Sequence, residues 1–120
     1  MCLSDGTKVW LNADSEIRYP VIFSKESRKV QLVGEAYFEV TADAHRPFFV
    51  QTTGGEIQVL GTGFNVRNYP EEDQTVTTLV HGKVAYTDMA NQIVVLTPGE
   101  QTIGQSGQQT ILQQVNTDYY

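Results

Sequence analysis

The side chains that most often perform catalysis or bind metals are few and widely spaced in this chain of 120 residues. Histidine occurs only at His45 and His81, and cysteine only at Cys2. Metal sites and activated nucleophiles need several such groups at short, regular spacings, and neither histidine has a partner of that kind. We expect His45 to be solvated in a loop and His81 to face solvent between two strands. The sequence therefore predicts no enzyme, no metal site and no cofactor.

Two short motifs resemble ligand-binding loops only in part. Gly61-Thr62-Gly63 is similar to a fragment of a phosphate-binding loop, but it lacks the third glycine, the lysine and the helix that hold phosphate. A β-bulge or tight corner is the better interpretation. Glu71-Glu72-Asp73 lacks the alternating ligands and the glycine of a calcium loop, so it is interpreted as a solvated loop tip.

Aromatic residues are the more informative candidates. Trp10, Tyr37, Phe49 and Tyr69 fall on the strand face opposite the regularly spaced apolar positions. Exposed Trp and Tyr side chains can stack on sugars or anchor a protein partner. The alternative is that both faces of these strands are buried, with Trp10 in the core. These four residues are the predicted partner-binding positions.

Charge excludes two classes of partner. The chain carries 14 acidic and 8 basic residues, which gives a formal charge of −6, and its Lys and Arg residues are scattered. Nucleic acids and anionic membrane surfaces both require clustered basic residues. We therefore expect no nucleic-acid binding and no membrane contact, and no run approaches the roughly 18 apolar residues of a membrane span.

Short β-rich runs separated by turn residues predict the fold class. They favour an all-β, mostly antiparallel domain of about ten short strands, sandwich-like or barrel-like. Side chains alternate between two faces along a half-buried strand. The predicted core positions are Phe38, Val40, Phe64, Val66, Val84 and Leu96. The expected strands are 7–11, 16–19, 30–33, 35–40, 48–52, 56–60, 64–69, 74–80, 83–87, 93–96, 101–103 and 110–115.

A weak internal repeat accompanies these runs. The segment 7–11 and Arg18 can be laid over 56–60 and Arg67, which lies 49 residues later. The segment around Gly34 matches the segment around Gly82, 48 residues later. Two such units are too few for a solenoid, so we expect a pseudo-twofold core in which they pack face to face.

Six motifs in order resemble the FecR domain over about residues 3 to 103. Gly34-Glu35-Ala36-Tyr37-Phe38-Glu39-Val40 is the most telling of them. Two positions depart from the family pattern, because Gly63 stands where a larger residue is frequent and His81 where Glu is common. The other motifs lie at 3–13, 46–50, 59–66, 80–84 and 96–101.

The resemblance implies a function and a domain organisation. FecR-like regulators are similar in having a cytoplasmic anti-sigma segment, one membrane helix, a periplasmic domain like this one and a further C-terminal domain. We expect one domain over 1–120, with 1–2 as an added start, 3–103 as the core, and 104–120 as a final strand and the beginning of a linker. The implied partner is the N-terminal signalling domain of a TonB-dependent outer-membrane transporter. The sigma factor would be reached only through the cytoplasmic segment of a parent protein anchored in the inner membrane.

Two rival functions stay open at this point. A carbohydrate-binding β module would use the exposed aromatics to hold glycan directly. A structural or adhesive β domain would need neither ligand nor signal.

Overall fold

The computed structural model describes residues 1–72, 74–105 and 108–112, and these residues form eleven strands and no helix. The prediction of an all-β fold is confirmed. The strands are β1 (Lys8–Leu11), β2 (Glu16–Arg18), β3 (Arg28–Glu39), β4 (Phe48–Gln51), β5 (Gly55–Val59), β6 (Gly63–Asn68), β7 (Thr75–His81), β8 (Val84–Asp88), β9 (Ile93–Leu96), β10 (Gln101–Gln105) and β11 (Gln108–Leu112).

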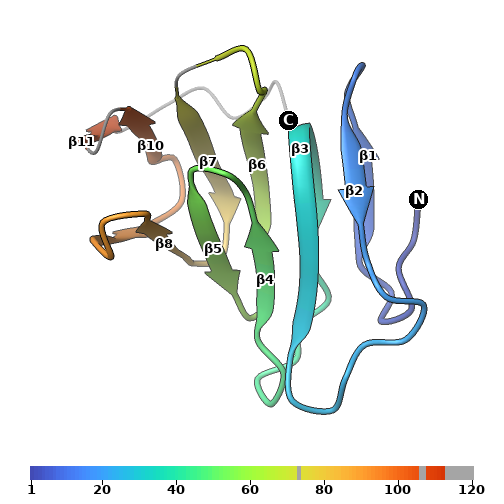
Figure 1. Ribbon diagram of the computed structural model, residues 1–120. Coiled ribbons are helices and arrows are strands. Elements are labelled where there is room, and N and C mark those ends of the chain that lie inside the picture. The colour runs from blue at the N-terminus through green and yellow to red at the C-terminus, as the bar shows by residue number, and fades with distance from the viewer. Residues whose placement is uncertain (73, 106–107, 113–120) are drawn as a thin grey trace.

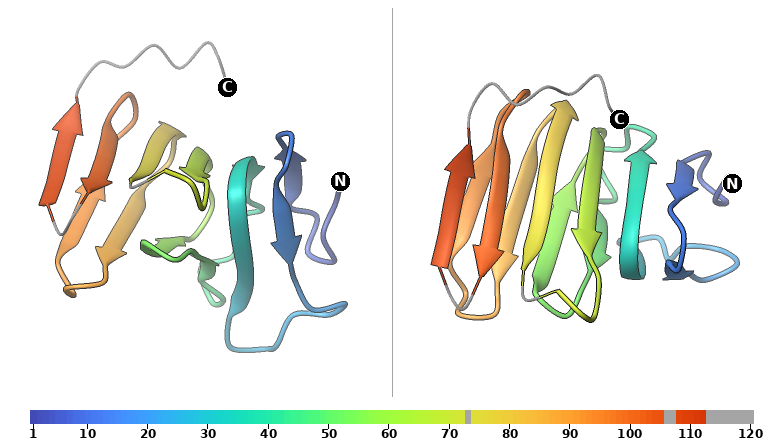
Figure 2. Two further views of the ribbon diagram at one scale, coloured as in Figure 1. Left: turned by 45° about the horizontal axis from the view of Figure 1, so that its top comes forward. Right: turned by 90° about the horizontal axis from the view of Figure 1, so that it is seen from above.

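One curled sheet makes both layers of the molecule. The strand order is β11-β10-β7-β6-β3-β4-β5-β8-β9, with β1 and β2 added alongside β3. In Figures 1 and 2, β6 and β7 form one wall, β4 and β5 form the other, and β3 lies at the end where the two walls meet. All pairs are antiparallel except β3 with β4, which is parallel. This single pair makes the sheet mixed, and the sheet as a whole is nearly closed and barrel-like.

The strand β3 belongs to both walls. Its first half pairs with β2 and β4, and its second half pairs with β1 and β6. The sequence predicted two strands separated by Gly34, but the structure has one strand of 12 residues that continues through it. Gly34 has a φ of 101°, a conformation that costs glycine little, so the strand changes direction without ending. A Cβ at this position would lie 2.8 Å from the Cα of Ser15, which leaves no room for a side chain.

Strand pairing agrees with the predicted repeat in scheme but not in its offset at the first strand. Val9 lies opposite Phe38 and Ile57 opposite Tyr86, so Val9 corresponds to Ile57, 48 residues later, whereas the predicted offset of 49 placed it over Gln58. Likewise β2 pairs with the first half of β3 as β6 pairs with β7. Gly34 and Gly82, the matched pivots, both have positive φ values, of 101° and 93°. The two units therefore share their pairing scheme, while the twofold relation between them stays a prediction.

The core lies between the walls and is filled by alternate side chains. Along β3, buried and more exposed residues alternate throughout, as the period of two requires. Phe38 and Phe64 stack with ring centroids 5.1 Å apart at the centre. All six predicted core residues are buried, so this prediction is confirmed; they are Phe38, Val40, Phe64, Val66, Val84 and Leu96.

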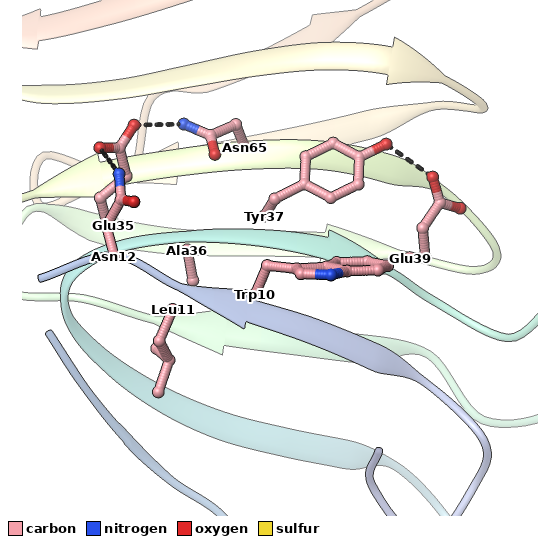
Figure 3. Close-up of a pocket in the computed structure, with 8 residues that line it drawn as sticks. All are labelled: Trp10, Leu11, Asn12, Glu35, Ala36, Tyr37, Glu39 and Asn65. Carbon is pink, nitrogen blue, oxygen red and sulfur yellow. Dashed lines mark hydrogen bonds between the residues drawn. The ribbon is translucent and has the colours of Figure 1, made fainter. Parts of the chain in front are cut away.

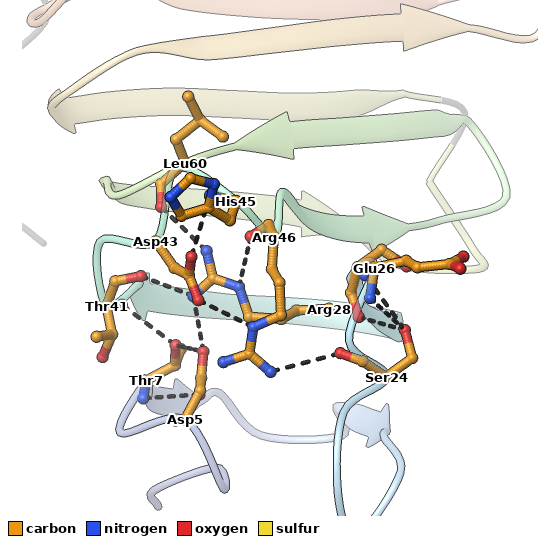
Figure 4. Close-up of polar contacts among 11 residues, drawn as sticks. Asp5, Thr7, Ser24, Glu26, Arg28, Thr41, Asp43, His45, Arg46 and Leu60 are labelled. Carbon is orange, nitrogen blue, oxygen red and sulfur yellow. Dashed lines mark hydrogen bonds and ion pairs between the residues drawn. The ribbon is translucent and has the colours of Figure 1, made fainter.

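A charged residue is also fully buried. The guanidinium of Arg28 donates from Nε to the carbonyl of Arg46 (2.8 Å) and from Nη2 to that of Leu60 (3.0 Å). Its Nη1 donates to the carbonyl of Thr41 (2.7 Å) and to Oδ2 of Asp5 (2.8 Å). Figure 4 shows how Arg28 joins the first turn of the chain to two loops. The sequence reasoning did not anticipate this cluster.

Two predictions concern the ends of the chain. The strand predicted at 110–115 is present as β11 up to Leu112, and its residues 113–115 lie outside the described part of the structure. Within the described residues, no helix has the length and apolarity needed to cross a membrane.

Candidate functional site

A groove lies on the outer face of the sheet, across β1, β3 and β6 (Figure 3). Trp10 is directly opposite Tyr37, and Tyr37 is directly opposite Asn65, so side chains from three adjacent strands share this face. The hollow measures about 620 Å³. We call it the Trp10–Tyr37 groove; its lining residues are Trp10, Leu11, Asn12, Glu35, Ala36, Tyr37, Glu39 and Asn65.

Two of the four predicted aromatic residues meet here. The rings of Trp10 and Tyr37 are tilted, with centroids 5.6 Å apart. Trp10 is 53% exposed although it is the largest apolar side chain of the protein, and Tyr37 is half-buried. The alternative that Trp10 belongs to the core is wrong, because side chains alternate along β1: Val9 is buried, and the next residue, Trp10, lies on the outer face.

Glu35 organises the polar end of the groove. Its Oε1 accepts a hydrogen bond from Nδ2 of Asn12 (2.5 Å), and its Oε2 accepts one from Nδ2 of Asn65 (2.8 Å). Arg67 lies 3.6 Å from the same carboxylate. The backbone N–H of Glu35 donates to Oγ of Ser15 (2.8 Å), which secures β3 beside the loop after β1. These contacts hold two amides and a carboxylate in fixed positions.

Glu39 organises the other end. It accepts a hydrogen bond from the Tyr37 hydroxyl (2.6 Å), and Nε2 of His81 lies 2.9 Å from its second oxygen. Burial raises the pKa of Tyr37 far above its ordinary value, and the hydrogen bond that Tyr37 donates to Glu39 and the negative charge of Glu39 raise it further. The Tyr37 hydroxyl therefore stays protonated and acts as a donor.

The other two predicted aromatics lie elsewhere. Tyr69 lies just after β6, with its ring under the Arg67 guanidinium (5.1 Å), and its hydroxyl donates to the carbonyl of Ala13 (2.9 Å). Phe49, on β4, is half-buried with Nζ of Lys29 5.7 Å from its ring centre. Tyr69 lies outside the groove and is connected to it through Arg67 and Ser15, which both contact Glu35, and Phe49 is not part of the groove.

The remaining motifs agree with their structural interpretations. The pairing of β6 with β7 shifts register between Gly63 and Phe64, which is the irregularity predicted at Gly61-Thr62-Gly63. Glu72, in the acidic loop, forms a double hydrogen bond with Arg67 (3.0 Å each). No group of three or more His, Cys, Asp or Glu side chains suited to a metal occurs among the described residues.

Comparisons with known proteins agree with this architecture. The family described as FecR protein matches residues 1–85. The chain belongs to the FecR family. Two crystal structures, at 1.65 and 2.50 Å resolution, show a protein of Parabacteroides distasonis ATCC 8503 described as a candidate anti-sigma factor. Each is 36% identical to this chain with a TM-score of 0.93, over 99% of this chain. The chain spans 57% and 56% of those two chains, and no curated protein matches it.

The two departures from the FecR pattern are one structural feature. Gly63 and His81 are direct partners across β6 and β7. A Cβ at Gly63 would lie 2.5 Å from Nε2 of His81 and 2.7 Å from Oε1 of Glu39. In this FecR domain the absence of a side chain at Gly63 therefore gives His81 the space to reach Glu39. The sequence reasoning noted both positions without connecting them.

The polar residues of the groove were missed by sequence reasoning. Glu35, Glu39, Asn12 and Asn65 were not singled out as site residues. The available signal was the period of two, which places Glu35, Tyr37 and Glu39 on one face. The partners on β1 and β6 depend on register, which the sequence does not state.

Proposed function

We propose that this FecR domain is a non-catalytic signalling module of an anti-sigma factor that acts in the periplasm. It would receive its signal from the N-terminal signalling domain of a TonB-dependent transporter and relay it to a sigma factor through other parts of the parent protein. The observation that carries the proposal is the 36% identity and TM-score of 0.93 to a candidate anti-sigma factor over 99% of this chain.

An open strand edge supports a protein partner. Among the described strands, β9 pairs only with β8, so its other edge offers unpaired backbone groups. Its side chains Ile93 and Val95 are 67% and 50% exposed. Beside them a shallow hollow is lined in part by Leu60, Lys83 and Ala85. Sheets commonly recognise partners by accepting a further strand at such an edge, with side-chain pockets that add specificity.

The test is binding of the purified chain to the N-terminal signalling domain of the transporter encoded beside the parent gene. We expect saturable binding by calorimetry, and we expect the variant Ile93→Lys/Val95→Lys to weaken it at least about tenfold. The matched control is Val21→Lys, because Val21 is 88% exposed in the loop between β2 and β3, away from this edge.

Three outcomes separate the alternatives. Binding that Val21→Lys preserves and the β9 variant loses supports the relay and its contact edge. Binding that both variants preserve supports the relay but moves the contact to another surface. A parent-protein fusion whose reporter, joined after Ile103, is active only in the cytoplasm would overturn the periplasmic signalling function.

A further inference from the structure

We infer that the Trp10–Tyr37 groove is a binding site for a neutral saccharide. This inference does not depend on the signalling function, because the groove lies on β1, β3 and β6 whereas the proposed partner edge is β9. It is carried by three properties of the groove, which are its charge, its aromatic wall and its polar groups.

Charge and existing contacts disfavour ionic ligands in the groove. The lining contains two carboxylates, Glu35 and Glu39, and these would repel an anion. Both are already engaged, Glu35 by Arg67 (3.6 Å) and two amides, and Glu39 by Tyr37 and His81. A cationic ligand would therefore have to displace existing partners. A neutral ligand meets neither penalty.

The aromatic wall suits the apolar face of a sugar ring. Trp10 and Tyr37 contact each other and leave a large part of the indole open to solvent. The faces of aromatic rings carry partial negative charge, and one face of a pyranose ring presents C–H groups with partial positive charge. The hollow of about 620 Å³ falls within the usual range of small-ligand sites, about 300–1,000 Å³.

The polar groups can meet hydroxyls, which both donate and accept. An asparagine amide has two N–H donors and one carbonyl oxygen. Asn12 and Asn65 each use one N–H for Glu35, which leaves each amide a second N–H and its oxygen. Figure 3 shows Asn12 and Asn65 on either side of Glu35 at the end of the aromatic wall. Because Glu35 holds these amides in place, little ordering is needed when a sugar binds.

The experiment uses the fluorescence of Trp10, the only tryptophan of the chain. The probes are the neutral disaccharides cellobiose, maltose, lactose and mannobiose, with glucose, glucuronate and glucosamine as similar monosaccharides that are neutral, anionic and cationic. We expect at least one disaccharide to shift the emission saturably, with a dissociation constant on the order of 1 mM. Within the charge series, glucose should bind more tightly than glucuronate or glucosamine.

Variants connect the signal to the groove, and calorimetry replaces fluorescence when Trp10 is changed. Trp10→Ala should abolish binding, and Asn12→Ala should weaken it at least about tenfold. Phe49→Ala is the matched control, because Phe49 is a half-buried aromatic outside the groove, and it should bind normally. No response to any neutral probe up to about 20 mM, or sugar binding that survives Trp10→Ala, would overturn the inference. Loss of transporter-domain binding in Trp10→Ala without any sugar binding would also overturn it and make the groove a protein contact.

Discussion

Two polar clusters of this FecR domain use the same kinds of side chain in opposite surroundings. In the first, Arg28 and Asp5 form an ion pair with side chains 0% and 3% exposed. In the second, Glu35 and Arg67 lie 3.6 Å apart at the edge of an open groove. Backbone carbonyls complete the buried cluster, whereas amide side chains complete the open one.

The difference shows which cluster can take part in recognition. Every donor atom of the buried guanidinium has an internal partner, so no group is left for a ligand and the cluster serves the fold. In the open cluster, Asn12 and Asn65 line the groove and each uses only one N–H for Glu35; Asn12 is exposed and Asn65 is largely buried. Burial therefore separates a structural polar network from a candidate binding network, although their residue types overlap.

The apolar core sets the scale for this comparison. Phe64→Ala or Phe38→Ala should lower the free energy of unfolding by about 3–5 kcal/mol, because each removes a fully buried ring and leaves a cavity. Urea denaturation followed by Trp10 fluorescence measures the change. Little shift in the denaturation midpoint of either variant would contradict the assignment of the inward strand face.

Breaking the buried pair should cost nearly as much. Asp5→Ala removes the carboxylate that pairs with Arg28 and leaves a buried charge without this counter-ion, so we expect a loss of about 3–5 kcal/mol. The matched control is Asp43→Ala, which breaks the more exposed pair with Arg46. Equal losses in the two variants would show that burial does not distinguish them.

Acid should weaken the buried cluster selectively. Burial alone would raise the pKa of Asp5, but hydrogen bonds from Thr7 and Arg28 outweigh it and hold the pKa below its ordinary value of 3.8. A carboxyl with a lowered folded-state pKa stabilises the fold above its unfolded pKa and loses this effect as the pH falls through the folded value. Asp5→Asn should thus be less stable than the parent at pH 5–7. This gap, the difference in free energy of unfolding between the two proteins, should narrow below about pH 4.

Denaturation at a series of pH values measures this gap. Part of the acid sensitivity should survive in Asp5→Asn, because hydrogen bonds from Arg46 and Arg67 also lower the pKa values of Asp43 and Glu72. A gap that stays constant down to pH 2 would mean that Asp5 is not the linked group.

The open cluster should tolerate change best. Asn12→Ala should alter the free energy of unfolding by less than about 1 kcal/mol, because Asn12 is exposed and its loss leaves Glu35 accessible to water. The same denaturation series gives the value. A loss as large as that of Asp5→Ala would show that the groove residues hold the fold together and would remove their distinction from the buried cluster.

The sequence predicted local features well and long-range ones poorly, for physical reasons. The period of two identified Phe38 and Phe64 as inward, because alternation is visible within a single strand. Gly34 was read as a break because glycine usually weakens strands, yet here it bends β3 between two sets of neighbours. Arg28 was overlooked because its burial depends on carbonyls contributed by separate loops. The groove was found only in part, since Trp10 and Tyr37 were predicted but their polar neighbours depend on register.

The sharing of β3 between the two walls has a consequence for folding cooperativity. Because four strands pair with β3, neither wall can keep its full set of neighbours if this strand detaches. Local unfolding that leaves the rest of the sheet intact should therefore be restricted to strands remote from β3, such as β9 and β11. Amide protons in the middle of β3 should exchange with solvent only through global unfolding, whereas those of β9 exchange through local opening.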